Sequence, residues 1–156
     1  MILWRISNYS HLEGLGGERA SGRWHTAARG RRIVYLSEHP SLALIEVLVN
    51  LKGNPLLFPD RYQMLQVNVP ADVTVDELHP GSLVEGWQDD VQATRNLGDQ
   101  WLKDQRMALL KVPSAPSPES FNYLLNPNHP DATKVTVKFG RWLRYDRRLF
   151  HVQKGP

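Results

Sequence analysis

The carboxylate of Glu46 stands alone in an apolar run. Residues 42–49 read Leu-Ala-Leu-Ile-Glu-Val-Leu-Val, so Glu46 is the only polar side chain among them. A helix that is apolar all round is usually buried, and a buried carboxylate must be paired, hydrogen-bonded or protonated. The run therefore predicts a buried helix with a carboxylate facing an active-site cleft. A glutamate at the edge of the apolar arc, reaching solvent, is the structural alternative.

Two arginines occupy positions suited to binding an anion. Arg5 lies within the apolar segment 2–6, and Arg23 stands between Gly22 and Trp24. A guanidinium forms paired hydrogen bonds with phosphate, and an aromatic face can stack on a base. Gly-Arg-Trp is therefore a candidate phosphate-and-base clamp. An outward-pointing strand arginine and an ordinary basic loop are the alternatives.

Tyr35 and Ser114 stand beside the ends of predicted strands. Tyr35 lies on a short strand just before the helix of Glu46, and Ser114 follows an apolar strand. These places suit side chains that line a crevice. No Gly-x-Ser-x-Gly motif surrounds Ser114, so we expect it to form hydrogen bonds rather than act as a nucleophile. An ordinary strand aromatic and a turn-capping serine are the alternatives.

The composition excludes several kinds of site. The chain has no cysteine, so disulfides, thiolate catalysis and zinc–thiolate sites are ruled out. His25, His39 and His129 do not follow metal-ligand spacings, and we assign no metal. No phosphate-binding glycine fingerprint occurs. The first ten residues lack the core of a signal peptide and no apolar run spans a membrane, so we expect a cytoplasmic protein without a membrane contact.

Positive charge is concentrated in two segments. The net charge is +3, from 19 basic and 16 acidic residues. Residues 19–32 carry five arginines and no acid, and residues 134–154 carry seven basic residues and one acid. Such segments fit a nucleic acid, an anionic small molecule or an acidic protein partner, or simply a solvated face.

The pattern of elements indicates an α+β domain covering residues 1–156. The predicted strands are residues 2–6, 32–37, 62–69, 73–75, 107–112, 133–139 and 142–150. One helix is predicted from Pro40 to about Leu51, and another from Trp87 to Asp104 with an interruption near Gly98. The intervening residues 12–31, 113–118 and 122–130 are predicted as an irregular loop, a rigid extended turn and a turn-rich segment.

The order of several short motifs resembles the RES family, named for its arginine, glutamate and serine. The matching pieces are Trp4-Arg5, Gly22-Arg23-Trp24, Tyr35-Leu36-Ser37-Glu38, Ala43-Leu44-Ile45-Glu46, Gly98-Asp99-Gln100-Trp101-Leu102, Val112-Pro113-Ser114 and residues 122–130. Together they cover almost the whole chain. The family commonly has Gly-Gly-Arg-Trp-Asn, whereas this chain has Ser21 and His25 at the first and last of these positions.

The resemblance implies a toxin of a bacterial toxin–antitoxin pair that destroys NAD⁺. It implies a fold similar to ADP-ribosyltransferase toxins, with NAD⁺ in a cleft between two small sheets. NAD⁺ is then the substrate, broken down by phosphorolysis, with inorganic phosphate as co-substrate, or by glycohydrolysis. The implied partner is a helix-turn-helix antitoxin that blocks the cleft and makes any DNA contact, in a complex that can hold a toxin homodimer.

The resemblance also assigns roles to five residues. Glu46 stabilises positive charge on the ribose, Arg5 and Arg23 hold the pyrophosphate or an incoming phosphate, Tyr35 packs against nicotinamide or ribose, and Ser114 orients the nicotinamide end. Two other functions stay open. One is a mono-ADP-ribosyltransferase that modifies a macromolecule through the same cleft. The other is a nucleic-acid-binding module that uses the basic ends.

Overall fold

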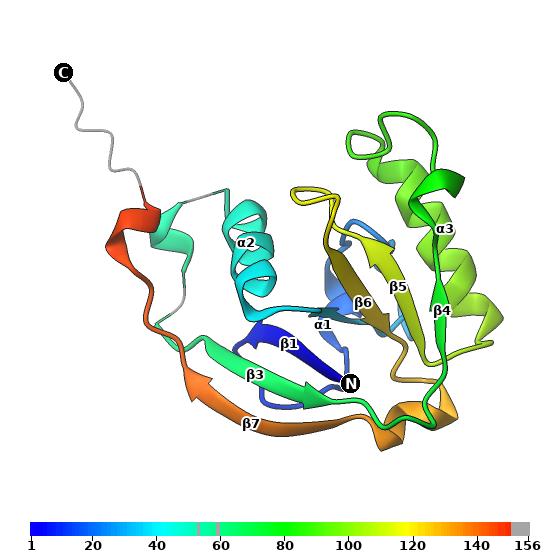
Figure 1. Ribbon diagram of the computed structural model, residues 1–156, viewed down its shortest axis with the longest axis horizontal. Helices are drawn as coiled ribbons and strands as arrows, with labels where there is room; N and C mark the ends of the chain where they lie inside the picture. Colours follow the sequence, from blue (N-terminus) through cyan, green and yellow to red (C-terminus); the bar gives the residue numbers. More distant parts are fainter. Residues whose placement is uncertain (53, 59, 151–156) are drawn as a thin grey trace.

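The computed structural model describes residues 1–52, 54–58 and 60–150. Its main feature is a seven-stranded sheet with the order β4-β5-β6-β2-β1-β3-β7. The strands are β1 (Ile2–Ser7), β2 (Val34–Ser37), β3 (Gln63–Asn68), β4 (Val75–Glu77), β5 (Leu109–Pro113), β6 (Phe121–Leu125) and β7 (Thr136–Trp142). All neighbouring strands are antiparallel except β4 and β5, which are parallel. In Figure 1, β3 and β7 form one end of this sheet, and β4 and β5 form the other.

The sheet has two halves joined by a short contact. β1 pairs with β3 over its full length, and β2 pairs with β6 over its full length. Between the halves, however, β1 and β2 share only the pair Trp4 and Ser37. The two expected small sheets are therefore the halves of one sheet, and the strands diverge on either side of this junction.

Within the described residues, three α-helices accompany the sheet, namely α1 (Gly16–Arg19), α2 (Pro40–Asn50) and α3 (Val91–Asp104). Helix α2 begins at Pro40, whose missing N–H suits the first turn, and packs against β1 and β2. Asp90 caps α3 by accepting a hydrogen bond from the Ala93 N–H. Short 3₁₀ helices cover Pro55–Leu57, Pro80–Ser82, Pro130–Lys134 and Arg147–Leu149.

Apolar side chains cover both faces of the sheet. Successive strand residues point to opposite faces, so Leu109 and Leu110 of β5 belong to different core clusters. Leu125 and Leu124 of β6 divide in the same way. The first cluster contains buried apolar side chains of β1, β2 and β3, such as Leu3, Leu36 and Leu65. The second contains three tryptophans, Trp24, Trp87 and Trp101. Helix α3 contributes Trp101 and thereby closes the second face.

Helix α3 is continuous through Gly98, which corrects the predicted interruption. A Cβ atom on Gly98 would lie 1.7 Å from the Trp24 carbonyl oxygen. The glycine therefore permits the close approach of the segment around Trp24 to the helix, and it does not break the helix. The helix also begins at Val91 rather than at Trp87.

Other predictions need correction. Residues 122–130 were expected to be turn-rich, but residues 122–125 belong to β6 in the middle of the sheet. Residues 142–150 do not form a strand, because β7 ends at Trp142 and a 3₁₀ helix follows. Helix α2 is not buried all round, since only Leu42 and Ala43 are fully buried and Val49 is 54% exposed.

Candidate functional site

A cavity of about 560 Å³ lies at the junction of the two half-sheets. Its walls come from β1, α1, the segment 20–25, β2, α2, the start of α3 and β6. This volume lies within the usual range for small-ligand sites, roughly 300–1,000 Å³. Four of the five predicted site residues line it, namely Arg5, Arg23, Tyr35 and Glu46. The fifth, Ser114, is not part of the cavity wall but forms a hydrogen bond with Glu46. The structure therefore brings all five residues together. We call this cavity the cleft.

Two hydrogen bonds hold Glu46 from the side of the sheet. Its Oε1 atom accepts one from the Ser114 hydroxyl at 2.8 Å and one from the Asn122 side-chain amide at 2.6 Å. Ser114 has no exposed surface. Both bonds reach the same oxygen, and no hydrogen bond to Oε2 is found in the part of the chain that the structure describes. The second oxygen is thus available to a ligand in the cleft.

Sequence reasoning missed two residues that support Glu46. Asn122 accepts a hydrogen bond from the Ser37 hydroxyl at 2.8 Å, which orients its amide N–H toward Glu46. These two residues face each other across the β2–β6 pair, where they form a registered pair. Asn122 lay in a segment whose role the sequence left open. A polar residue at the end of β2 and another near the start of β6 were the only available signal.

Arg5 and Arg23 line the cleft, and each has a buried guanidinium nitrogen without a protein partner among the described residues. The Nη1 atom of each is buried and donates no hydrogen bond to an acceptor among the described residues. Burial lowers the pKa of Arg5 to about 10. An unsatisfied buried polar group is rare in folded proteins and calls for an explanation. A bound anion supplies one.

Arg95 is a third cleft arginine, which the sequence did not reveal. It reaches the cleft from α3, and its Nε donates a hydrogen bond to the Gly22 carbonyl at 2.8 Å. The described part of the chain gives no ion pair for Arg5, Arg23 or Arg95. With Glu46 as the only acidic residue lining the cleft, the described walls carry an excess of two positive charges.

The Tyr35 hydroxyl forms hydrogen bonds with the two residues that follow Arg23. The Tyr35 oxygen lies 2.8 Å from His25 Nδ1 and accepts a hydrogen bond from the Trp24 N–H at 3.1 Å. Burial raises the pKa of Tyr35, so the phenol stays protonated. His25 is only 2% exposed and lines the same cavity.

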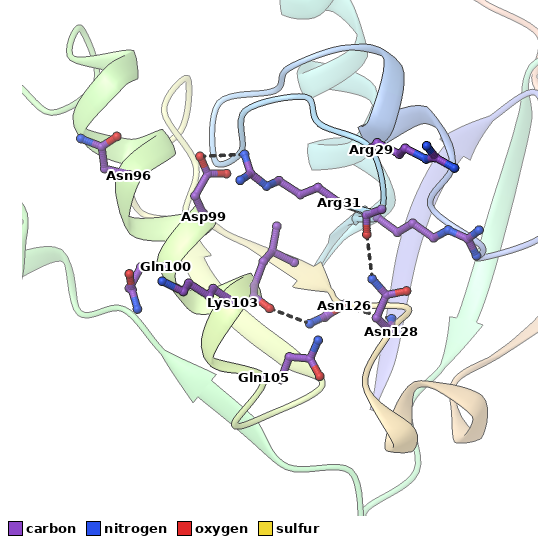
Figure 2. A pocket seen from close by; sticks show the side chains of 12 residues that line it. Arg29, Arg31, Asn96, Asp99, Gln100, Lys103, Gln105, Asn126 and Asn128 are labelled. Carbon is purple, nitrogen blue, oxygen red and sulfur yellow. Dashed lines mark hydrogen bonds and ion pairs between the residues drawn. The ribbon is translucent and has the colours of Figure 1, made fainter.

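A second cavity of about 520 Å³ lies between the loop 29–32, α3 and the segment around Asn126. Figure 2 shows Arg31 pointing toward Asp99 of α3. Their closest atoms are 3.2 Å apart, and Arg31 also donates a hydrogen bond to the Thr26 carbonyl at 2.8 Å. We call this the Arg31 cavity. Its central arginine is satisfied by the protein itself.

The described residues give no structural sign of two other kinds of site. Residues 1–52, 54–58 and 60–150 contain no cluster of three histidine or acidic side chains arranged to hold a metal ion. Within the same ranges, none of the helices combines the length and the apolar content needed to cross a bilayer.

Comparisons with known proteins give a family match and relatives of similar length. The model of the RES domain matches residues 2–148. The chain is 43% identical to Toxin Res of Pseudomonas putida, over 96% of this chain and all of the relative. It is 35% identical to the Prs ADP-ribosylating toxin of a Sphingobium species, over 94% of both chains.

A solved structure shares the fold. The M. tuberculosis MbcT–MbcA toxin–antitoxin complex contains a chain that matches with a TM-score of 0.73. The match covers 91% of this chain and 83% of that chain, at 16% identity. The expected fold class, an α+β domain similar to ADP-ribosyltransferase toxins, is thereby confirmed.

Proposed function

We propose that this chain, which belongs to the RES domain family, is a toxin that breaks the nicotinamide–ribose bond of NAD⁺. The observation that carries the proposal is the pair of buried, unpartnered guanidinium nitrogens of Arg5 and Arg23, two residues that line the same cleft as Glu46. Burying a charge without a partner is costly, so these groups favour a ligand that supplies negative charge. The pyrophosphate of NAD⁺ carries two such charges, which match the excess of two positive charges in the cleft.

The carboxylate fits the chemistry of the bond that breaks. As the C–N bond to nicotinamide breaks, its electron pair leaves with neutral nicotinamide and positive charge develops on the ribose. Glu46 stabilises that charge more in the transition state than in the ground state, which lowers the barrier. An oxygen of phosphate or water then bonds to the ribose carbon, and with water a proton is released.

The hydrogen bonds divide the remaining roles. Arg5 and Arg23 hold the pyrophosphate through charge-assisted hydrogen bonds. Tyr35 presents its ring to the nicotinamide or ribose. Ser114 acts through Glu46, because its hydroxyl donates to that carboxylate and it is fully buried. We therefore propose that Ser114 fixes the carboxylate, in place of the expected direct contact with nicotinamide.

A second candidate is a mono-ADP-ribosyltransferase that uses the same cleft. It is favoured by the 35% identity to a relative named as an ADP-ribosylating toxin. The two functions share bond cleavage and differ in the acceptor. Incubation with labelled NAD⁺ and phosphate, and separately with cell lysate, distinguishes them. Labelled macromolecules support the transferase, and small ADP-ribose products alone support NAD⁺ degradation.

The proposal includes a partner and a cellular effect. The partner is a helix-turn-helix antitoxin that blocks the cleft, in a complex that contains a toxin homodimer, and the site of action is the bacterial cytoplasm. Expression of this chain alone should stop growth and lower cellular NAD⁺, and coexpression with the antitoxin should reverse both. Arrested cells with unchanged NAD⁺ would contradict the proposed reaction.

A further inference from the structure

The turn that carries Arg23 is fixed by side chains from other elements. The Gly22 carbonyl accepts a hydrogen bond from Arg95 Nε at 2.8 Å, and the Arg23 carbonyl accepts one from the Thr94 hydroxyl at 2.8 Å. The Trp24 N–H donates to the Tyr35 hydroxyl. The backbone on both sides of Arg23 is therefore fixed before any ligand binds.

The His25 ring also contacts this turn and the Tyr35 hydroxyl. Its Nδ1 atom lies 2.8 Å from the Tyr35 oxygen and accepts a hydrogen bond from the Gly22 N–H at 3.2 Å. Its Nε2 atom lies 3.1 Å from the Gly17 carbonyl oxygen. One ring thus connects three segments, which are α1, the turn at Gly22 and the strand of Tyr35.

The partners determine which nitrogen carries the proton. A carbonyl oxygen can only accept, so Nε2 must donate to Gly17. The Gly22 N–H donates to the His25 carbonyl at 3.1 Å and also points at Nδ1 at 3.2 Å. Since an N–H can only donate, this shared contact favours an Nδ1 that accepts and carries no proton. The Tyr35 O–H consequently donates to Nδ1. Since this oxygen also accepts from Trp24, the Tyr35 hydroxyl both donates to and accepts from the protein, and Tyr35 lines the cleft with its position fixed.

We infer that His25, neutral with its proton on Nε2, is a positioning residue that fixes Tyr35 and the turn of Arg23 for binding the nucleotide. The inference rests on the proposed function for the identity of the nucleotide. Its structural basis is independent of that function. The close packing at Gly22 also supports the inference, because a Cβ atom there would lie 2.4 Å from the Tyr35 oxygen and 3.0 Å from His25 Nδ1. The three residues fit together only with glycine at position 22.

Two substitutions separate the two nitrogens of the ring. In His25→Asn, the amide stands near the position of Nδ1 and keeps an acceptor for Gly22 and Tyr35. In His25→Gln, the longer amide stands near Nε2 and keeps only the bond to Gly17. We expect His25→Gln to raise KM for NAD⁺ about tenfold with kcat within about twofold, because the two contacts of Nδ1, to Gly22 and to Tyr35, are lost. His25→Asn should retain most of the affinity. Equal KM values for the two variants would contradict the inference.

Two further measurements do not depend on catalysis. The ¹⁵N chemical shifts of the His25 ring report which nitrogen carries the proton, and calorimetry with inorganic pyrophosphate reports the anion site. We expect a protonated Nε2, and weaker pyrophosphate binding by about tenfold in His25→Gln only. A protonated Nδ1, equal affinities, or no pyrophosphate binding by the unchanged protein would overturn the inference. A protein that binds pyrophosphate as expected but leaves NAD⁺ intact would contradict the proposed function alone.

Discussion

The cleft and the Arg31 cavity have similar volumes, about 560 and 520 Å³, and both are lined by arginines. They differ in how those arginines are satisfied. In the Arg31 cavity, Arg31 pairs with Asp99 at 3.2 Å, and Arg32 nearby pairs with Glu18 at 3.0 Å. In the cleft, Arg5 and Arg23 each keep a buried nitrogen without a partner in the described structure.

This difference separates a structural arginine from a binding arginine. An arginine that pairs with an acid stabilises the protein itself, and its removal leaves the acid unpaired. An arginine that is buried without a partner costs stability, and that cost is offset only when an anion binds. The presence of arginines in a cavity is therefore weak evidence for a site. Their unsatisfied hydrogen bonds are the stronger evidence.

The largest difference in activity is expected when the acidic residue of each cavity is replaced, Glu46 in the cleft and Asp99 in the Arg31 cavity. Glu46→Gln keeps the acceptor for Ser114 and Asn122 but removes the negative charge, so turnover should fall about 10²–10³-fold. The matched control is Asp99→Asn, which weakens the pair with Arg31 and should keep kcat within about threefold while lowering the melting temperature. Steady-state kinetics and thermal unfolding of both variants test this. A fully active Glu46→Gln protein would remove Glu46 from the mechanism.

The second effect concerns the arginines and has opposite signs in the two cavities. Arg5→Gln should raise KM for NAD⁺ about 10- to 100-fold, because a charge-assisted contact to pyrophosphate is lost. The same change should raise the melting temperature of the ligand-free protein, since an unpaired buried charge is removed. Arg31→Gln should leave KM unchanged and lower the melting temperature. A stabilising Arg31→Gln or a destabilising Arg5→Gln would break the comparison.

A third effect tests how the cleft carboxylate is held. Asp99 is oriented by an arginine, whereas Glu46 is oriented by neutral donors, of which Ser114 is the most buried. Ser114→Ala removes one bond to Glu46 and should lower kcat about tenfold with a smaller change in KM. Ser117→Ala is the control, because its hydroxyl contacts only Ser120 among the described residues. Equal kinetics of the two variants would argue against a role for Ser114.

The sequence predicted those strands whose apolar pattern is local. β1, β3 and β5 were each predicted within about two residues of their observed ends, as was α2. β6 was missed because Asn122 lies inside it and Asn126 directly follows it, which resembles turn chemistry. Its adjacent Leu124 and Leu125 are buried on opposite faces, so the strand lacks the alternation that marks a half-exposed strand. Only the pairing with β2 and β5 reveals its central place.

The residues of the site also fall into those that local sequence features predicted and those that only the folded structure reveals. Arg5, Arg23, Tyr35, Glu46 and Ser114 were predicted from unusual neighbours in the sequence and from the order of the motifs. Arg95 and Ser37 could not be, because an arginine on a polar helix face and a serine at a strand end are ordinary. Their roles depend on the packing of α3 against Gly22 and on the register of β2 with β6. Such long-range contacts leave no periodic pattern in the chain.

The smallest expected effect is a pH dependence of stability at His25. Burial lowers the pKa of His25, and the Gly17 and Ala20 carbonyls and Asp99 of α3 oppose this shift, while Arg31 adds to it. These groups, the Gly22 N–H and the Tyr35 hydroxyl are the polar neighbours of the ring among the described residues. Because the pKa is lower in the folded protein, the unfolded chain binds the proton first as the pH falls.

The sign of the effect follows from that order of protonation. Stability from the neutral ring is fully present above the unfolded pKa, about 6.5, and is lost as the pH falls toward the folded pKa. The melting temperature should therefore decrease between about pH 7.5 and about pH 5, and less so in His25→Asn, whose side chain does not titrate. The variant also retains the Nδ1-like acceptor, so the two proteins should differ little at the upper pH. Parallel curves for the two proteins would show that the ring titrates in the folded protein as it does in the unfolded chain, and the same experiment on Arg31→Gln would show how much the neighbouring cation contributes.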